Sequence, residues 1–545
     1  MIVNFNEIPS VNKLFKDYIH HYRKVKDFFH GDPFNLENHR KIMNKIKKRK
    51  YNREILYSLL SEKNTEFGCS ANTLNNIELL TRNNTFVAIG GQQVGVLGGP
   101  LYTFYKALTT IKLAQKLTSY LRNNVIPIFW LASDDHDFSE ISHINIIDKN
   151  NQIAKLNYSP KSYSHGYPMY ALNLQYEIDE LIEKINFCTY ESEFKNGIMA
   201  ELKNCYNTEA TISKAFGKWL AKVFSNYGLV IIDPSHDKLK NMGSYIFKKE
   251  IEFHLETKST LNRTNQQLKA SAYHNQVECN DQSLNLFLND NGRRIILKKR
   301  NEKFGLRGSD KEFSSKQIIN LIDEHPEYFS PNALLRPLFQ DYCLPTIAYV
   351  AGPDEIAYFA QLKSLYKFFN LTMPIIFPRV SITLIEKKIS KILIKQKIEI
   401  KKIVRKPNET SQNLIKNRIS KPLKEILNKT QSSIEQNLQK LKIPLIQFDP
   451  NLKDILDKSS SKIQFELKWV EKKVLQAHKK QHQIVISQID KIKNHLFPHQ
   501  HLQERYLSWV PYLIKYGWGF TETILNKINL KRKGHQFLEI DYSPK

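Results

Sequence analysis

At 545 residues the chain is too long for one ordinary domain, so two or three folding units are expected. Hydrophobic residues make up 41% of the chain and aromatic residues 11%, which is enough to build a sizeable core. No secretory leader is visible, and the longest apolar run, 125–132, is far too short to cross a bilayer. The five cysteines lack CxxC spacing, which argues against a disulfide framework or a cysteine zinc site. We therefore expect a cytoplasmic protein without a membrane partner.

The net charge of +27 is the feature most typical of nucleic-acid binding. More than half of the excess lies between 381 and 500, where 26 Lys and Arg stand against 11 Asp and Glu. These basic residues are mostly lysines spread along helical patterns, and no RRM, KH or zinc-finger motif accompanies them. Because net charge governs solubility and association rather than fold, nucleic acid is not the favoured partner. A basic coiled-coil scaffold or nucleic-acid-associated protein is kept as an alternative.

The first eighty residues predict helices, because apolar residues recur there at three- and four-residue spacing. From residue 85 onward the pattern changes to short apolar runs that each end in a polar or glycine turn. The runs are TFVAI, VIPIFWLAS, GLVIID, TIAYVA and MPIIF. Helical segments follow three of the turns, most clearly at 101–121 and 355–369. This alternation predicts a parallel α/β sheet, whose ligands bind outside the carboxyl ends of the strands.

Two long polar tracts interrupt the strand series, at about 145–213 and 237–330, and we interpret them as insertions into the sheet domain. From 381 onward two heptad-like helices flank KIPLIQFDPN, which favours an antiparallel coiled-coil hairpin over a plain helical bundle. The aromatic tail LQERYLSWVPYLIKYGWGF is expected to pack back on the globular part. The predicted domains are 1–380, 381–497 and 498–545. The predicted seam positions are Leu423, Leu427, Thr430, Ile434, Asn437 and Leu441 in the first helix, and Ile463, Leu467, Val470, Val474, Ala477, Gln481 and Ile484 in the second.

The first chemistry-bearing stretch is the glycine-rich turn FVAIGGQQVGVLGGPLYTFYKA, 86–107. Its glycines would let main-chain N–H groups approach an anion, and Pro100 suits the start of a helix whose dipole favours negative charge. Lys106, about two turns into that helix, could reach back as a point charge. A tight turn without a ligand is the alternative. The residues of this candidate site are Gly90, Gly91, Gln92, Gln93, Gly98, Gly99, Pro100 and Lys106.

The second stretch is SDDHDFSEISH, which places three carboxylates and an imidazole at a strand end. A helix would put His136, Glu140 and His143 on one face, which permits either a metal site or a general acid/base pair. Metal binding is the weaker interpretation, because no second cluster with ligand spacing is evident. Asp134 or Asp135 capping a helix is the alternative, and Asp135 could cap while His136 and Asp137 face the crevice.

The third stretch is RPLFQDYCLPTIAYVAGPDEIAYFAQLKSLY, whose turn is Gly352-Pro353. Glu355, Tyr358 and Gln361 follow at three-residue steps, so one helix face could point into the crevice. Arg379, at the end of the last strand, is a candidate carboxylate or phosphate clamp. Arg336 with Asp341 is interpreted as a possible internal ion pair, and Cys343 as a buried packing residue.

Together these stretches resemble the bacillithiol-biosynthesis cysteine-adding enzyme family, BshC, over nearly the whole chain. The resemblance also rests on MPIIFPRVSITLIE and LQERYLSWVPYLIKYG. It implies a Rossmann-like core with two connecting insertions and a long antiparallel coiled coil that mediates homodimerisation. The positions matching the family motifs are Gly91, Gln92, Gln93, Gly95, Gly99, Pro100, Tyr102 and Lys106; Asp135, His136, Asp137 and Phe138; and Gly352, Pro353, Glu355, Tyr358 and Gln361.

The activity that the resemblance implies is the joining of L-cysteine to glucosaminyl-malate, the last step of bacillithiol biosynthesis. ATP is expected by analogy with related synthetases, although the chain has a GQQ turn where they have a HIGH-type turn, and no KMSKS equivalent. In this hypothesis the glycine turn and Lys106 hold phosphates or malate carboxylates. His136 is the general base, oriented by Asp135 or Asp137, and Asp137 or Glu355 could instead bind the α-ammonium of cysteine. A metal-dependent hydrolase is a further alternative.

Overall fold

The computed structural model describes residues 1–541 except 164, 279–281, 406–420 and 482. The chain forms two compact units, one made of 1–384 with 501–545 and the other of 385–500. Among the described residues, no helix is long and apolar enough to span a membrane. Each unit is described in turn.

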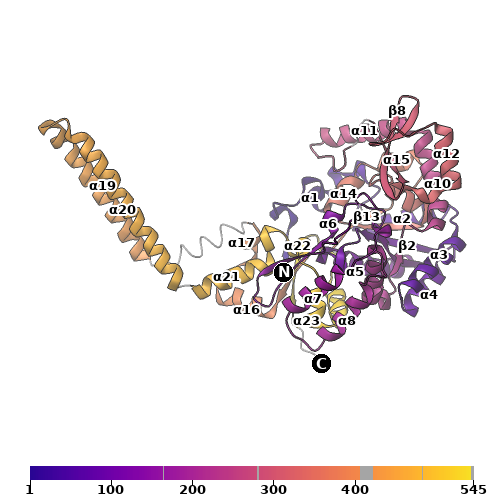
Figure 1. Cartoon of the computed structure of the whole chain (residues 1–545), viewed down its shortest axis with the longest axis horizontal. Helices are drawn as coiled ribbons and strands as arrows, with labels where there is room; N and C mark the ends of the chain where they lie inside the picture. Colours follow the sequence, from indigo (N-terminus) through magenta and orange to yellow (C-terminus); the bar gives the residue numbers. More distant parts are fainter. Residues whose placement is uncertain (164, 279–281, 406–420, 482, 542–545) are drawn as a thin grey trace. The chain divides into compact units, whose positions relative to one another are not determined.

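The core of the first unit is a five-stranded parallel sheet built from the five apolar runs, as predicted. Its order is β13-β12-β2-β3-β6 (Figure 1). The strands are almost wholly buried, because helices cover them and leave no solvent-facing side. The strands are β2 (Thr85–Gln92), β3 (Asn124–Leu131), β6 (Val230–Ile232), β12 (Thr346–Ala351) and β13 (Ile375–Pro378).

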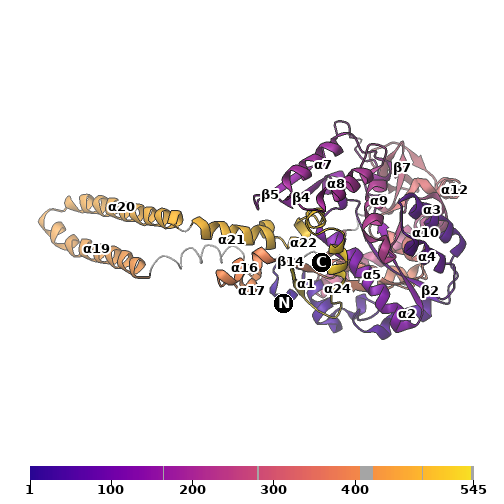
Figure 2. The same cartoon turned by 90° about the horizontal axis from the view of Figure 1, so that it is seen from below.

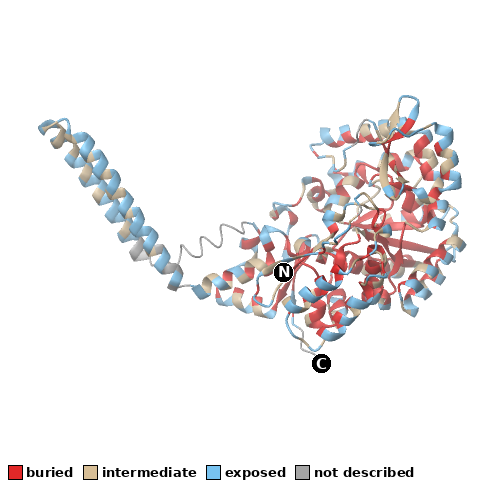
Figure 3. Ribbon diagram, viewed as in Figure 1, coloured by how far each residue is buried: buried red, intermediate tan, exposed pale blue. Residues whose placement is uncertain are grey.

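Helices on the sheet and before it complete this core, and the buried residues gather around it in Figure 3. The crossover helix between β2 and β3 is buried along most of its length and packs on both strands. The helices are α1 (Lys13–His20), α2 (Leu36–Ile46), α3 (Arg53–Glu66), α4 (Ala71–Leu79), α5 (Leu101–Leu121), α14 (Pro353–Phe359) and α15 (Lys363–Phe368).

Two segments interrupt the sheet, as predicted for a core with two insertions. The first, between β3 and β6, holds α6 (Phe138–Ile141), the hairpin β4 (His143–Ile147) and β5 (Ile153–Asn157), then α7 (Glu177–Cys188), α8 (Lys195–Cys205) and α9 (Ile212–Phe224). The second, between β6 and β12, carries an antiparallel sheet of order β10-β9-β8-β7-β11. Its elements are α10 (Asp237–Glu252), α11 (His254–Ala270), β7 (Ser283–Asp290), β8 (Arg293–Arg300), β9 (Lys303–Leu306), β10 (Glu312–Phe313), α12 (Ser315–Glu324), β11 (Phe329–Pro331) and α13 (Arg336–Cys343).

The C-terminal segment belongs to the first unit, which confirms that the aromatic tail packs back. Trp509 is fully buried and stacks on Trp219 of α9, with ring centroids 5.5 Å apart. The elements of this segment are α22 (Gln503–Tyr506), α23 (Val510–Tyr516), α24 (Gly519–Lys527) and β15 (His535–Ile540). Strand β15 joins a small sheet of order β1-β15-β14, with β1 at Ile2–Val3 and β14 at Ile382–Glu386.

The second unit is helical, and α19 (Lys421–Phe448) and α20 (Leu452–Gln481) run side by side as the predicted hairpin (Figures 1 and 2). The predicted linker KIPLIQFDPN is mostly wrong, because α19 continues through Pro444 to Phe448 and only 449–451 lie between the helices. The other helices of the unit are α16 (Lys387–Lys395), α17 (Ile400–Arg405) and α21 (Gln483–Leu496).

The seam of the hairpin follows the predicted heptads only in part. In α19 Leu427 and Ile434 are half-buried, but the next half-buried leucine is Leu438, and the predicted Leu441 is 50% exposed. The seam has shifted by one residue after Ile434, a step of four instead of three. In α20 Ile463, Leu467 and Val474 are half-buried, whereas Val470 and Ala477 are exposed. The predicted Ile484 is also exposed, and it lies in α21 and not in α20. The predicted positions Leu423 and Gln481 lie outside the described side chains.

Candidate functional site

A cavity of about 540 Å³ opens at the carboxyl ends of the parallel strands, where the sequence predicted it. It is lined by the turn after β2, the first turns of α5, the start of α14 and the residue after β13. Its lining includes Gly91, Gln92, Gln93, Tyr102, Lys106, Trp130, Glu140, Arg336, Tyr349, Gly352, Asp354, Glu355, Tyr358, Arg379 and Arg505. A cavity of about 150 Å³ shares Gln92, Gln93, Tyr102, Glu140 and Arg505 with it and adds Gly95, Gly99 and His143.

Lys106 is the central ion-pairing residue of the larger cavity. Its ammonium donates to the carbonyl of Gly91 (2.6 Å), to Oε1 of Gln92 (2.9 Å) and to Oε2 of Glu355 (2.5 Å). An ammonium has three hydrogens, so these three contacts use them all. Burial lowers the pKa of Lys106, and the Glu355 carboxylate opposes that effect. Lys106 therefore ties the β2 turn to α14, and its hydrogens are not left for a phosphate.

The Glu355 carboxylate has two further hydrogen-bond donors besides Lys106. Its Oε2 also accepts from the N–H of Gly352 (2.7 Å), which caps the start of α14 from the third helical residue, and its Oε1 accepts from the Tyr349 hydroxyl (2.8 Å). Both carboxylate oxygens are thus occupied by protein donors. The geometry suits a structural brace between β12, α14 and α5 better than an ammonium-binding group.

The glycine turn does not present its amides to the cavity as a phosphate loop does. The N–H groups of Gly95 and Gly99 donate to carbonyls within the turn, that of Gly98 to the Tyr206 hydroxyl (3.0 Å), and that of Leu101 to the carbonyl of Leu507 (2.8 Å). Gly98 has φ +87°, and a Cβ there would overlap the indole ring of Trp509. These four amides are therefore not free to bind a phosphate, and position 98 needs glycine for close packing on the C-terminal segment.

Arg336 is the cavity residue best placed to receive an anion. Among the residues that the structure describes, its hydrogen-bond acceptors are neutral: Gln340 Oε1 (3.0 Å), the Tyr358 hydroxyl (2.9 Å) and the Tyr349 hydroxyl (3.3 Å). The expected pairing with Asp341 is not what the structure shows. Asp341 instead accepts from the Tyr366 hydroxyl and from Gln340, and burial raises its pKa to about 6.

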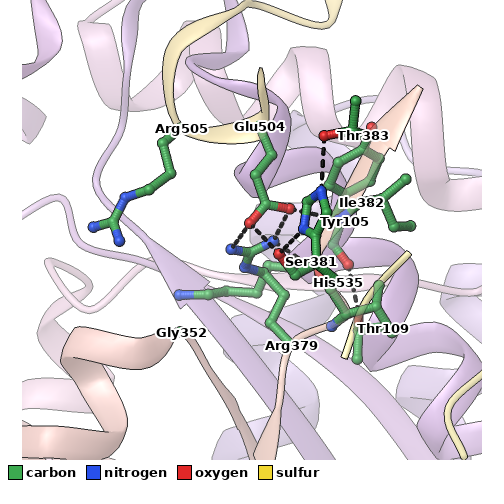
Figure 4. A network of polar contacts seen from close by, with 12 residues as sticks. Tyr105, Thr109, Gly352, Arg379, Ser381, Ile382, Thr383, Glu504, Arg505 and His535 are labelled. Carbon is green, nitrogen blue, oxygen red and sulfur yellow. Dashed lines mark hydrogen bonds and ion pairs between the residues drawn. The ribbon is translucent and has the colours of Figure 1, made fainter. Parts of the chain in front are cut away.

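Arg379 lines the cavity but is already paired (Figure 4). Two of its nitrogens donate to the two carboxylate oxygens of Glu504, at 3.0 and 2.9 Å, a bidentate pair that is fully buried. Burial opposes ionisation of Glu504, yet the guanidinium holds the pKa of this carboxyl below its usual value. Arg379 therefore lines the cavity, but Glu504 of the C-terminal segment already balances its charge.

The buried network continues from Glu504 to His535 (Figure 4). The Ser381 hydroxyl donates its one hydrogen to Glu504 (2.8 Å), so it must accept from Nδ1–H of His535 (2.7 Å). Nε2 of His535 then accepts from the Thr383 hydroxyl (2.8 Å). Burial lowers the pKa of His535 to about 4, which agrees with a neutral ring in this arrangement.

The SDDHD turn lies beside the cavity, since its Asp135, His136 and Asp137 are absent from the lining. Asp135 is linked to the lining by one hydrogen bond, from Nε2 of Gln93 to its Oδ2 (2.7 Å). The same amide donates to Glu140 (2.8 Å). Asp134 is buried in an ion pair with Lys240 of α10 (2.8 Å).

The predicted helix from His136 to His143 is wrong. Asp137 accepts from the N–H of Ser139 (3.2 Å) and caps α6, which therefore starts after it and covers only Phe138–Ile141. His143 begins β4, so His136, Glu140 and His143 do not share a helix face. Within the described part of the chain, no group of three or more His, Cys, Asp or Glu could hold a metal ion.

Gln361 does not share a face with Glu355 and Tyr358. Helix α14 ends at Phe359, and Gln361 is fully buried beyond it, donating to Asn265 Oδ1 (2.7 Å) and to the carbonyl of Val277 (2.9 Å). Cys343 is buried and its thiol pKa is raised by burial, which confirms a packing residue.

The residue that sequence reasoning missed is Arg505, which lines both cavities and pairs with Asp354 at 2.5 Å. Together with Glu504 it comes from the C-terminal segment, more than one hundred residues after β13. The signal that could have found both is a glutamate and an arginine in an otherwise aromatic and apolar tail. Tyr349 and Glu140 were also missed as cavity residues.

Fold and cavity define an α/β protein with a Rossmann-like core and a cavity at the carboxyl ends of its strands. The family model "Bacillithiol biosynthesis BshC, N-terminal Rossmann-like domain" matches residues 1–380, and that of the BshC C-terminal coiled-coil domain matches 382–540. The chain therefore belongs to the BshC family of bacillithiol biosynthesis.

Similar proteins cover nearly the full length. A relative from Salinibacter ruber is 31% identical over 97% of this chain and 96% of its own, and one from Chlorobium phaeobacteroides is 30% identical over 99% of both. Both carry the name "Putative cysteine ligase BshC". A solved structure titled "putative arginyl t-RNA synthetase" from Campylobacter jejuni covers 83% of this chain and 97% of its own, at 12% identity and a TM-score of 0.21.

Proposed function

We propose that this chain is a cysteine ligase that forms an amide bond between L-cysteine and glucosaminyl-malate, the last step of bacillithiol biosynthesis. Family membership and the names of the full-length relatives support the reaction class. The observation that carries the substrate assignment is the half-buried Arg336, whose hydrogen-bond acceptors among the described residues are neutral. A carboxylate of the malate group would give this guanidinium the anionic partner that the protein leaves out.

In this proposal the cavity residues bind and orient the substrates. Arg336 receives a malate carboxylate, and Arg505 at the cavity wall supplies a second cation, shared with Asp354. The Lys106–Glu355 pair keeps the β2 turn and α14 in place around them. The proposed catalytic roles of Asp135, His136 and Asp137 stay predictions; of the three, Asp135 has the hydrogen bond to the cavity through Gln93.

Amide formation in water requires an activated carboxylate, and we propose ATP as the source of that activation. The amides of Gly95, Gly98, Gly99 and Leu101 do not suit its phosphates, because carbonyls and a tyrosine hydroxyl already accept their hydrogens. What the chain itself offers is a cavity of about 540 Å³, lined by arginines, in which the two substrates could meet.

A direct assay tests the proposal. Purified protein is incubated with L-cysteine and glucosaminyl-malate, with and without ATP, and the amide product is measured by mass spectrometry. We expect product only when both substrates and ATP are present. If product is absent under every condition, and stays absent when fresh cell extract is added to supply a missing partner, the ligase proposal is wrong.

We also propose that the protein is a cytoplasmic homodimer that associates through α19 and α20. The support is a set of large apolar side chains exposed on the hairpin although the seam between the two helices is already formed. They include Ile426 (59% exposed), Ile443 (68%), Ile455 (59%), Phe465 (67%) and Trp469 (50%). Phe465 and Trp469 are four residues apart on α20 and therefore share one helix face, and exposed apolar surface of this kind is typical of an association site. A basic coiled-coil scaffold remains the alternative to the ligase function, and the assay for the amide product separates these two functions.

A further inference from the structure

The ring nitrogen Nδ1 of His136 contacts an arginine, whereas a histidine that acts as a general base usually has a carboxylate at this position. Nη1 of Arg294, on β8, lies 3.2 Å from Nδ1 of His136, with hydrogen-bond geometry. The nearest carboxylate oxygen in an ion-pair range, Oδ1 of Asp135, lies 3.9 Å from Nδ1, beyond hydrogen-bond distance. Asp135 uses that oxygen for the N–H of His136 (2.8 Å), and Asp137 uses its own to cap α6. Neither carboxylate orients the ring.

Arg294 is held so that its position is fixed independently of His136. Its Nε donates to the Ser330 hydroxyl (2.9 Å), its Nη2 donates to the carbonyl of Pro331 (2.9 Å), and its guanidinium carbon lies 3.7 Å from the centre of the Phe287 ring. A guanidinium carries five donors, no acceptor, and stays protonated in proteins. Nδ1 of His136 must therefore be the acceptor, and in the neutral ring the proton then lies on Nε2.

We propose that Arg294 is a positioning residue that fixes His136 as the neutral tautomer protonated on Nε2, so that the ring offers a hydrogen-bond donor and not a base. Nothing among the described residues hydrogen-bonds Nε2, and 37% of the side chain is exposed. The ligand group that fits is an oxygen acceptor, such as a carbonyl or carboxylate. The use of this donor in catalysis rests on the proposed ligase function; the tautomer itself does not.

The charged groups around His136 have opposite effects on the pKa of its ring. Burial and the Arg294 guanidinium lower the pKa of His136, whereas the carboxylates of Asp135 and Asp137 raise it. The Tyr163 hydroxyl reaches His136 at its backbone carbonyl (3.4 Å) and not at the ring. Removing the guanidinium should leave the two carboxylates to dominate, and the histidine should then take up a proton at higher pH.

The first test needs no substrate. The rate of hydrogen exchange at the imidazole C2 position, followed by mass spectrometry against pH, gives the pKa of His136 in the purified full chain. We expect the pKa of His136 to lie below 6.5 in the wild type. In Arg294→Met we expect a pKa at least about one unit higher, which is a tenfold weaker acid. Arg293→Met, at the exposed neighbouring position on β8, is the matched control and should leave it unchanged. An unshifted His136 in Arg294→Met would overturn the proposal.

Solid-state ¹⁵N NMR of histidine-labelled protein reads the tautomer directly, with His136→Gln identifying the signal by difference. A protonated Nε2 supports the proposal, and a protonated Nδ1 overturns it.

Activity gives the third readout, because the amide of Gln can replace an Nε2–H donor but cannot act as a base. We expect His136→Gln to keep activity within about tenfold, while His136→Ala loses about a hundredfold or more. Equal loss in both variants overturns the donor role. If the exchange and NMR results hold and wild-type protein makes no amide, the ligase function alone has failed.

Discussion

Two glycines with positive φ show that the same backbone conformation can have different costs when a side chain is added. Gly98 has φ +87° and packs directly against Trp509, whereas Gly68 has φ +73° and nothing within 4 Å of an added Cβ. The first position requires glycine for space and for conformation, the second for conformation alone.

We predict that Gly98→Ala lowers the free energy of unfolding by about 2–4 kcal/mol, because overpacking adds to the conformational strain. Gly68→Ala should cost only about 1 kcal/mol, from the strain alone. Denaturant unfolding of both variants makes the comparison. Equal losses would mean that contact with the C-terminal segment does not determine the residue at 98.

Arg336 offers a prediction about binding. Arg336→Met removes the proposed partner of a malate carboxylate, so KM for glucosaminyl-malate should rise about 10- to 100-fold, the value of a charge-assisted hydrogen bond. KM for cysteine should change much less. Arg336→Lys keeps the charge but loses the planar fork and should fall between the two. A KM for glucosaminyl-malate that is unchanged in Arg336→Met would place the carboxylates elsewhere.

At the scale of elements, β14, α22 and β15 are joined by one buried polar network. Glu504 bonds Arg379, Ser381 and the N–H of Ile382 (2.8 Å), and His535 bonds Ser381 and Thr383. Every hydrogen in the chain of contacts has one assigned acceptor, so a proton added to Nε2 of the imidazole would leave two donors facing each other at Thr383. Such networks are costly when one member changes charge.

This network predicts a pH-dependent stability. The pKa of His535 is about 4 when folded, against 6.5 ordinarily, so between these values the unfolded chain binds a proton that the folded chain does not. The stabilisation is complete above pH 6.5 and declines as the pH falls toward 4, by up to about 3 kcal/mol. His535→Gln should lose stability at neutral pH but show a flatter decline between pH 7 and 5, measured by denaturant unfolding at both values. A slope equal to that of the wild type would contradict the assignment.

The sequence predicts this level of structure unevenly, and the reasons are physical. All five parallel strands follow from buried apolar runs, because a strand covered on both faces has no polar alternation to obscure it. The extent of α6 does not follow, because Asp137 rather than an earlier aspartate caps it. The cavity position follows from the strand ends. The pairing of Lys106 with Glu355 and of Arg379 with Glu504 does not, since each partner lies far away in sequence and depends on tertiary packing.

At the scale of the whole molecule, the exposed apolar residues of the hairpin predict self-association. Phe465→Ser with Trp469→Ser should convert a dimer into a monomer, measured by sedimentation, while the helical circular dichroism stays within error of the wild type. Phe187→Ser removes an equally exposed aromatic side chain (73%) from α7 of the first unit and should leave the assembly unchanged. A doubly substituted protein that sediments as the wild type does would exclude this face as the dimer contact.

The placement of Glu504 and Arg505 has a consequence for how the protein is made. Residues 385–500 are synthesised after the last strand of the parallel sheet and before the segment that closes the first unit. Until residue 509 leaves the ribosome, Gly98 has no Trp509, and a few residues earlier Arg379 still has no Glu504 and the cavity still lacks Arg505. While more than one hundred codons are translated, the apolar surface of the nascent sheet domain that later packs against the C-terminal segment therefore stays uncovered. During that interval it is the form of the protein that chaperones would bind.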